Sequence, residues 1–180
     1  MDKLQFAIVL CTTRENRSSD QVGDWVLDEA RKLNNHNYEI VDLKDYPMSF
    51  FGDNDSVEIA KKFNDRLRIF DGYIFVLAEY NHSIPGVLKS ALDWVNDSIA
   101  NKAAAIVSYG AVGGARAAEH LRSILGQLQV ADISRQTLFS IFNDFEPQKH
   151  FKPQKLQYEL FAEMIEQLEL WTKAFKSIRN

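Results

Sequence analysis

The stretch YIFVLAEYNHSIPGVLKSALDW, residues 73–94, contains the pattern that decides the fold. Residues 73–78 are an unbroken apolar run, which is typical of a strand buried on both faces of a sheet. Polar side chains occupy 79–83. Pro85 then introduces a segment with helical apolar spacing, since proline is well tolerated in the first turn of a helix. The stretch therefore predicts a buried strand, a polar turn and a helix over 86–95.

The same alternation continues on both sides of this stretch. Further apolar runs predict strands at 6–11, 38–41, 103–108 and 137–141, the last of them short. Apolar residues at helical spacing predict helices within 22–33, 59–70, 121–128 and 156–178. Apolar strands that alternate with helices indicate right-handed βαβ units, and hence an α/β fold with a parallel sheet and helices on both faces. We expect one domain over 1–180, because no linker or repeat interrupts the pattern.

Composition limits the classes of function. Of the 180 residues, 46% are hydrophobic and 26% are charged, which is ordinary for a globular protein, and the net charge is -4. An acidic chain lacks the basic footprint of a protein that binds nucleic acid or an anionic membrane. No apolar segment approaches the ~20 residues of a membrane span. We therefore expect neither nucleic acid nor a membrane as a partner.

The cysteine and histidine content bears on compartment and on metals. Cys11 is the single cysteine and cannot form an internal disulfide, and the first ten residues lack the basic-then-apolar plan of a signal peptide. Both observations favour a reducing, cytoplasmic location. The four histidines are scattered, with no pair at i,i+4 and no cysteine beside them, so we expect no metal site.

Ligands of open parallel sheets bind beyond the carboxyl ends of the strands, which directs attention to the loops after residues 11, 78 and 108. The first loop, Thr12 to Asp20, carries hydroxyls and two guanidiniums before a helix. The free N–H groups at a helix N-terminus suit a phosphate, and arginine adds charge-assisted hydrogen bonds. A serine N-cap beside two solvated arginines explains the loop equally well.

The other two loops are also open to two interpretations. The polar residues at 79–82 can line a ligand site, or each can be a cap, a surface side chain or a packed ring. The segment at 108–116 is rich in glycine, which lets backbone N–H groups approach a ligand closely. Its spacing fits neither a dinucleotide motif nor a P-loop, and a tight turn explains it as well. Three such loops at one edge of the sheet favour a ligand site.

Together these segments resemble the NADPH-dependent FMN reductase family, flavodoxin-like proteins that include azo, quinone and chromate reductases. The family's first signature is similar to TTRENR at 12–17 followed by VGDWV at 22–26, and its next segment to VDLKDYP at 41–47. Its most specific motif is similar to EYNHSIPGVLKSALDW at 79–94, and a later segment to SYGAVGGARAAEHLR at 108–122. The likeness runs from about residue 5 to about residue 130.

Three positions depart from the family pattern. Cys11 stands where glycine is usual, Ala78 where proline is common and Ser90 where asparagine is common. Cys11 requires a backbone that tolerates a Cβ atom, but none of the three changes removes a phosphate-binding group.

The resemblance implies a flavodoxin-like three-layer sandwich with a five-stranded parallel sheet in the order 2-1-3-4-5. It also implies a bound FMN that takes a hydride from NADPH or NADH and passes electrons to a small-molecule acceptor. That acceptor is a quinone, an azo compound, a metal oxyanion or free flavin. Because the flavin carries the chemistry, no catalytic side chain is expected, with proton donation by Tyr80 or His82 as the alternative.

The resemblance places cofactor-binding residues in all three loops. In the first loop, the residues expected around the phosphate are Thr12, Arg14, Arg17, Ser18 and Ser19. The residues expected along one side of the flavin ring are Glu79, Tyr80, Asn81 and His82. Those expected at its pyrimidine end are Ser108, Tyr109, Gly110 and Gly113.

Several alternatives remain open at the level of sequence. The aromatic-bearing connections 47–56 and 142–153 either line the acceptor pocket, form a subunit contact or pack onto the body of the protein. The resemblance implies a homodimer or homotetramer. Two rivals to a reductase are a flavodoxin-type electron carrier without NAD(P)H oxidation and an FMN-binding redox-sensing module. The arginines of the first loop argue against a carrier, whose phosphate loop is neutral.

Overall fold

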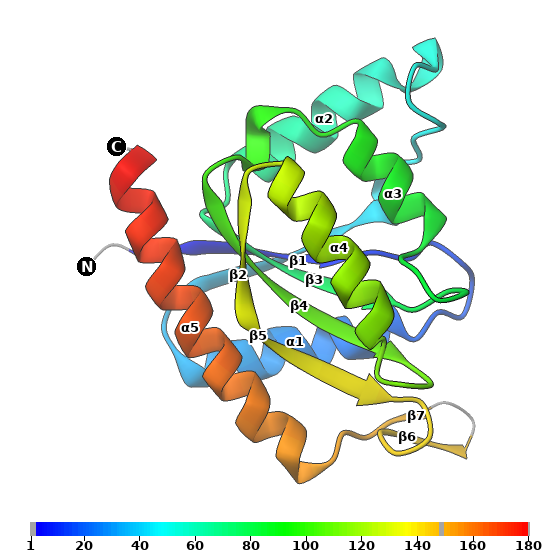
Figure 1. Ribbon diagram of the computed structural model, residues 1–180, viewed down its shortest axis with the longest axis vertical. Helices are drawn as coiled ribbons and strands as arrows, with labels where there is room; N and C mark the ends of the chain where they lie inside the picture. The colour runs from blue at the N-terminus through cyan, green and yellow to red at the C-terminus, as the bar shows by residue number, and fades with distance from the viewer. Residues whose placement is uncertain (1–2, 148–149, 180) are drawn as a thin grey trace.

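The protein is described by a computed structural model over residues 3–147 and 150–179. Its central sheet is parallel and has the order β2-β1-β3-β4-β5, as Figure 1 shows. The strands are β1 (Gln5–Leu10), β2 (Asn37–Asp42), β3 (Gly72–Ala78), β4 (Lys102–Gly110) and β5 (Val130–Ser140). The predicted strand order is confirmed.

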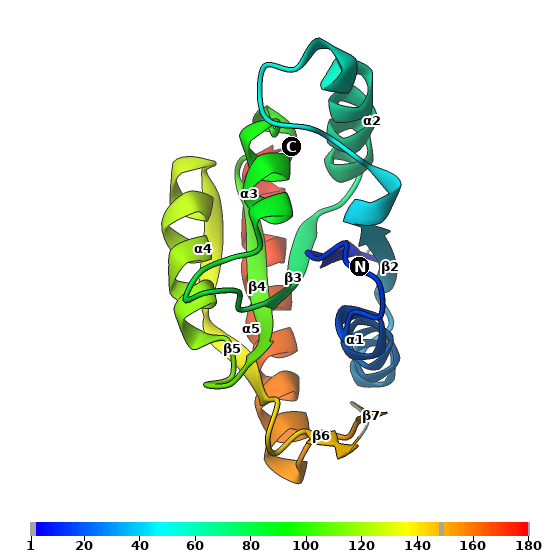
Figure 2. The same ribbon diagram turned by 90° about the vertical axis from the view of Figure 1, so that its right-hand side faces the viewer.

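Helices cover both faces of the sheet (Figure 2). One face packs against α1 (Ser19–Leu33) and α5 (Lys155–Arg179). The other packs against α2 (Val57–Arg68), α3 (Gly86–Asp93) and α4 (Ala115–Gln127). Short 3-10 turns η1 (Leu43–Asp45), η2 (Asn54–Ser56) and η3 (Asp97–Ile99) lie in the connections. The predicted three-layer sandwich is confirmed, and no helix among the described residues has the length and apolarity to cross a membrane.

The central strand β3 is apolar throughout because both of its faces are buried. Every residue of β3 is buried, and successive side chains point to opposite faces of the sheet. Phe75 and Leu77 therefore pack in the cluster beneath α2, α3 and α4, whereas Ile74 and Val76 pack in the cluster against α1 and α5. This arrangement fixes the carboxyl ends of β1, β3 and β4 at one edge, where the loops of interest begin.

β5 is longer than the short strand predicted over 137–141. It begins at Val130, and its pairing with β4 shifts register between Ala104 and Ile106. The first half of this edge strand mixes apolar and polar residues, and Arg122 of α4 forms an ion pair with Asp132 there. Since the buried residues of that half do not alternate, apolar periodicity detects only the second half.

A small antiparallel hairpin, β6 (Phe145–Glu146) and β7 (His150–Phe151), follows β5 and was not predicted. Strands of two residues are too short to carry a periodic signal. The hairpin packs through aromatic rings, with the centroids of Phe145 and Phe151 5.0 Å apart. Residues 148 and 149 of the connection 142–153 lie outside the described residues.

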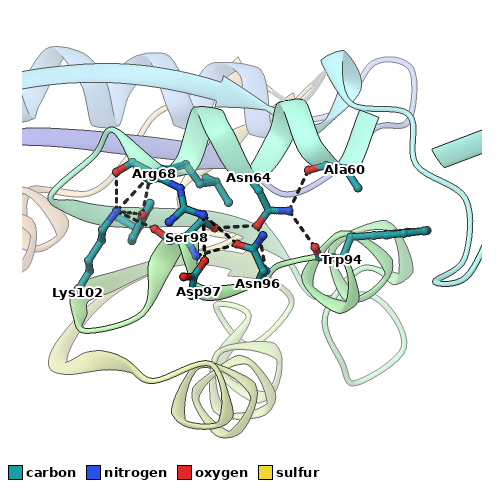
Figure 3. A network of polar contacts seen from close by, with 10 residues as sticks. Ala60, Asn64, Arg68, Trp94, Asn96, Asp97, Ser98 and Lys102 are labelled. Carbon is teal, nitrogen blue, oxygen red and sulfur yellow. Dashed lines mark hydrogen bonds and ion pairs between the residues drawn. The ribbon is translucent and has the colours of Figure 1, made fainter. Parts of the chain in front are cut away.

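A polar network closes the opposite end of the sheet, around the start of β4 (Figure 3). The Asn64 amide donates to the Ala60 and Trp94 carbonyls at 2.9 Å, and its oxygen accepts from Ser98 Oγ at 2.8 Å. The buried Lys102 ammonium donates to the Arg68 carbonyl at 2.9 Å and to the Ser98 carbonyl at 2.8 Å. Lys102 thereby satisfies a carbonyl at the C-terminal end of α2 and ties that helix to the sheet.

Candidate functional site

A cavity of about 640 Å³ opens at the carboxyl end of the sheet, within the usual size range of ligand pockets. Ligands of open α/β sheets bind where the strand order reverses. The cavity lies at that point, because the chain passes from β1 to β2 on one side of the sheet and from β3 to β4 on the other side. The predicted residues that line it are Arg14, Ser18, Glu79, Tyr80, Asn81, His82, Tyr109 and Gly110. All three predicted loops therefore contribute to one site.

The turn after β3 is a tight hairpin. The Tyr80 N–H donates to the Ser83 carbonyl at 3.0 Å, and the Ser83 N–H donates to the Tyr80 carbonyl at 3.1 Å. Between them Asn81 and His82 have φ angles of 47° and 72°, the left-handed backbone that two-residue hairpins require and that asparagine tolerates well. Ile84 is buried and anchors the turn. The backbone thus places the side chains of 80–82 along the cavity wall.

Glu79 connects this turn to α4. Its side chain is 5% exposed and forms an ion pair with the Arg116 guanidinium. It also accepts a hydrogen bond of 3.3 Å from the Arg116 backbone N–H in the first turn of α4. The N-cap of α4 is Gly114, which has no side chain to cap the helix, so the Glu79 carboxylate supplies an acceptor there.

The glycine-rich segment packs too closely for side chains. A Cβ atom on Gly114, whose φ is +76°, would lie 2.8 Å from Ser108 Cβ and 2.9 Å from the Tyr109 nitrogen. A Cβ atom on Gly113, also at positive φ, would lie 2.8 Å from Leu138 Cβ. Ser108 is fully buried and donates to the Gly113 carbonyl at 2.9 Å. Ser108 and Gly113 therefore shape the turn behind the cavity wall and do not line the cavity.

Tyr109 presents a buried phenol at the cavity. The residue is 6% exposed, and its hydroxyl finds no hydrogen-bond partner within the part of the chain that the structure describes. Burial raises the pKa of Tyr109 to about 12, and the neighbouring Ser19 and Thr12 hydroxyls oppose this rise, although neither meets the distance and angle of a hydrogen bond to the phenol. The phenol is therefore neutral near pH 7 and able to donate a hydrogen bond to a ligand.

Arg14 and Ser18 are the residues of the first loop that reach the cavity. Arg14 is exposed, with its guanidinium carbon 6.0 Å from the centroid of the Tyr80 ring. The Ser18 hydroxyl stands at the N-cap of α1 and makes no capping hydrogen bond. A free guanidinium beside a helix N-terminus is an arrangement that attracts an anion.

Arg17 lies away from the cavity, although the resemblance implies a place beside the phosphate. Its side chain is 2% exposed and donates to the Thr12 carbonyl, to Asp20 and to both carboxylate oxygens of Asp42 at the end of β2. Burial alone would raise the pKa of Asp42, but the Arg17 guanidinium and the Lys44 N–H hold it below its ordinary value. Arg17 thus fastens the first loop to β2 and does not line the cavity.

The hydroxyls of Thr12 and Ser19 are likewise internal. Both residues are fully buried, and their oxygens share a hydrogen bond of 2.5 Å. Cys11 beside them is also fully buried, and burial raises the pKa of its thiol, which therefore stays protonated. These buried residues thus form the interior of the first loop, whereas Arg14 and Ser18 face the cavity.

Some residues of the cavity wall were not predicted, namely Ala78, Ala111, Arg116, Ile141, Phe145 and Glu146. Arg116 belongs to the glycine-rich motif, so its motif was a signal even though the residue was not selected. Phe145 comes from the connection 142–153, for which lining the acceptor pocket was one of three alternatives. Among the residues that the structure describes, no group of three histidine, cysteine or carboxylate side chains is arranged to hold a metal ion.

The connection 47–56 lies elsewhere. Pro47 and Met48 line a separate hollow of about 260 Å³ near Thr13 and α3. Phe50 and Phe51 are 87% and 68% exposed, although the Phe51 ring packs at 5.0 Å from that of Trp94. This connection leaves an apolar surface beside α3.

Comparisons with known proteins agree with the fold and the motifs. The family described as NADPH-dependent FMN reductase matches residues 4–144. The NADH:(hydroxy)cinnamate reductase subunit CrdA of Vibrio ruber is 38% identical in an alignment of 99 residues that covers 52% of this chain and 49% of that protein. The 2-hydroxy-1,4-benzoquinone reductase of a Burkholderia species is 31% identical in an alignment of 144 residues that covers 76% of this chain and 78% of that protein.

A solved structure shares the fold along nearly the whole chain. FerB, a flavoenzyme NAD(P)H:(acceptor) oxidoreductase from Paracoccus denitrificans, superposes with a TM-score of 0.76 at 18% identity, over 96% of this chain and 98% of FerB. The chain spans about half of the Vibrio relative and about three quarters of the Burkholderia relative. The family match includes all three loops that form the cavity. The chain therefore belongs to the NADPH-dependent FMN reductase family.

Proposed function

We propose that the chain is an NAD(P)H-dependent reductase that holds FMN in the 640 Å³ cavity and delivers electrons to a small-molecule acceptor. The observation that carries the proposal is the convergence of unsatisfied donors on this cavity. The Arg14 guanidinium makes no hydrogen bond to the described residues, and the Tyr109 hydroxyl is buried without a partner. Buried or converging donors without partners indicate a ligand that completes them.

The donors fit the two ends of FMN. Arg14, the Ser18 hydroxyl and the start of α1 form a cationic, N–H-rich end suited to a phosphate monoester. The other end of the cavity is formed by the hairpin turn at 80–82 and the start of the glycine-rich segment. Backbone peptide groups and the Asn81 amide lie there, and they suit a flat ring whose edges form hydrogen bonds. Arg17 contributes indirectly, because its bonds to Thr12 and Asp42 hold the loop in place.

Bound FMN would supply two-electron transfer between a nicotinamide and an acceptor, chemistry that amino-acid side chains lack. The chain's own residues bind and orient the cofactor and the acceptor. Tyr109 donates a hydrogen bond as a neutral phenol, and Gly110 leaves space where a side chain would contact Glu79 Cβ at 3.1 Å. Phe145 and Ile141 supply apolar surface at the cavity wall. These roles need no nucleophile and no metal.

The acceptor, assembly and location are further parts of the proposal. The names of the relatives favour a quinone or a related conjugated small molecule. The exposed Phe50, Phe51 and Val87 favour a homodimer or a homotetramer built on the surface beside α3.

We propose a single domain over 1–180 in the cytoplasm, a compartment that suits a buried, protonated Cys11 as the single cysteine.

FMN binding and turnover test the proposal together. FMN is titrated into cofactor-free protein while the quenching of flavin fluorescence is followed, and quinone-dependent oxidation of NADPH and NADH is then measured. We expect saturable uptake of one FMN per chain and acceptor-dependent oxidation. FMN uptake without pyridine-nucleotide oxidation would favour the electron carrier or the redox-sensing module, and no uptake would contradict all three.

A further inference from the structure

A second hollow, of about 320 Å³, adjoins the cavity. Its walls are His82, Ala115, Arg116, Glu119 and His120. His82 and Arg116 also line the cavity itself, so the two spaces share a wall and one ligand can extend across both. The roles proposed above for FMN do not use His120 or Glu119.

The hollow is equipped with hydrogen-bond donors from two elements. The rings of His82 and His120 lie with centroids 6.3 Å apart and are tilted by 52°. Ser83 Oγ is 2.9 Å from His120 Nδ1, which orients the His120 ring. With the Ser83 hydroxyl as the donor in this bond, His120 Nε2 carries the proton and is available to donate to a ligand. Arg116 precedes His120 by four residues on α4, so both side chains project from one face of that helix.

Two carboxylates lie near the imidazoles, and each forms an ion pair with an arginine. Glu79 is buried in its ion pair with Arg116 and in its bond to the Arg116 N–H. Glu119 is 68% exposed and lies 3.3 Å from Arg122 Nε. Neither imidazole contacts a carboxylate in the described parts of the chain, and Arg116 Nε is buried there without a partner. Beside the exposed carboxylate of Glu119, the hollow therefore offers imidazole and guanidinium nitrogens, and these donors suit an oxyanion.

We infer that this hollow binds a phosphoryl group of the NAD(P)H co-substrate while its nicotinamide occupies the cavity. The inference rests on the proposed function, because it assumes that a pyridine nucleotide reaches the cavity. Every such nucleotide carries a diphosphate, and NADPH adds a 2′-phosphate. Both groups present the same chemistry to His120, His82 and Arg116. The hollow contributes affinity and orientation for the nucleotide, and His120, which lines the hollow but not the cavity, takes no part in bonding to FMN.

The test is equilibrium binding to the oxidised, FMN-loaded protein, measured by calorimetry with NADP+ and with NAD+, so no turnover is involved. The variants are His120→Ala, which removes the imidazole, and His120→Arg, which keeps a donor for an oxyanion. Lys61→Gln is the matched control, since it removes an exposed positive charge on α2, away from the hollow. Flavin absorbance records the FMN content of each protein.

Loss of a charge-assisted hydrogen bond at a partly exposed site predicts roughly fivefold to tenfold weaker binding for His120→Ala. We expect His120→Arg to recover most of the affinity and Lys61→Gln to match the wild type. Weaker binding of NADP+ alone would assign the 2′-phosphate, and equal weakening of both nucleotides would assign the diphosphate. Unchanged affinity of FMN-loaded His120→Ala for both nucleotides would overturn the inference, whereas a wild type that retains no FMN would overturn the proposed function itself.

Discussion

Replacing Arg17 by methionine should destabilise the fold, although a first-loop arginine of this family is expected at the phosphate. The Arg17 side chain is 2% exposed and the Asp42 side chain 20% exposed, so the substitution leaves a largely buried carboxylate without its guanidinium. Removing one partner of a buried pair costs about 3–5 kcal/mol. Because Asp42 retains some contact with solvent and the Lys44 N–H, we expect about 3 kcal/mol.

Urea unfolding measures this loss. With a slope of about 2 kcal/mol per molar urea, a loss of about 3 kcal/mol lowers the midpoint by about 1.5 M. The difference from wild type should also depend on pH. The pKa of Asp42 is held below its ordinary value in the folded state, so its stabilising contribution is complete above about pH 4 and is lost as the pH falls through the folded-state value. The gap between the two proteins should therefore narrow in acid.

Arg14→Met is the matched control, since Arg14 is exposed and makes no ion pair within the described residues. It should change stability by no more than about 0.5 kcal/mol. It should weaken FMN retention by about 1–3 kcal/mol if its guanidinium meets the phosphate. An unchanged urea midpoint for Arg17→Met, or an equal loss of stability for Arg14→Met, would refute the separate roles assigned to these arginines.

Three further outcomes follow from particular residues. Gly114→Ala should lower the free energy of unfolding by about 1–3 kcal/mol, because the backbone there is left-handed and the new Cβ atom would meet Ser108. Gly126→Ala, within α4, has open space and should raise the free energy of unfolding by about 0.5–1 kcal/mol. Equal effects of the two substitutions in urea unfolding would contradict this. Burial lowers the pKa of Lys102 to about 8, so between pH 8 and 10 the unfolded chain binds more protons at this side chain than the folded chain does. The free energy of unfolding of the wild type, relative to that of Lys102→Met, should therefore rise over this pH range. A difference between the two proteins that does not change with pH would contradict this. Cys11 should resist alkylation until urea unfolds the chain, and rapid labelling of the native protein would show that its burial is transient.

The sequence carried most of the information about the sheet. The runs at β1, β3 and β4 are apolar because those strands are buried on both faces, and burial of that kind leaves an unambiguous pattern. The first half of β5 left no such pattern, because an edge strand tolerates polar residues that bond to α4. The β6–β7 hairpin is too short for any periodicity.

The site was predictable as a set of loops but not residue by residue. Arg14 and Arg17 are the same residue type three positions apart, and only the fold shows that one faces the cavity and the other faces Asp42. Thr12 and Ser19 were indistinguishable from Ser18 for the same reason. Arg116 depends on Glu79, a partner 37 residues away, which no local pattern records.

The most direct measurement is the absorption spectrum of the purified protein before and after anaerobic addition of NADPH. A reductase with FMN in the cavity should show flavin bands that bleach on addition of the nucleotide. Bands that persist would contradict hydride transfer from NADPH, and a colourless protein that takes up no added FMN would contradict the site itself.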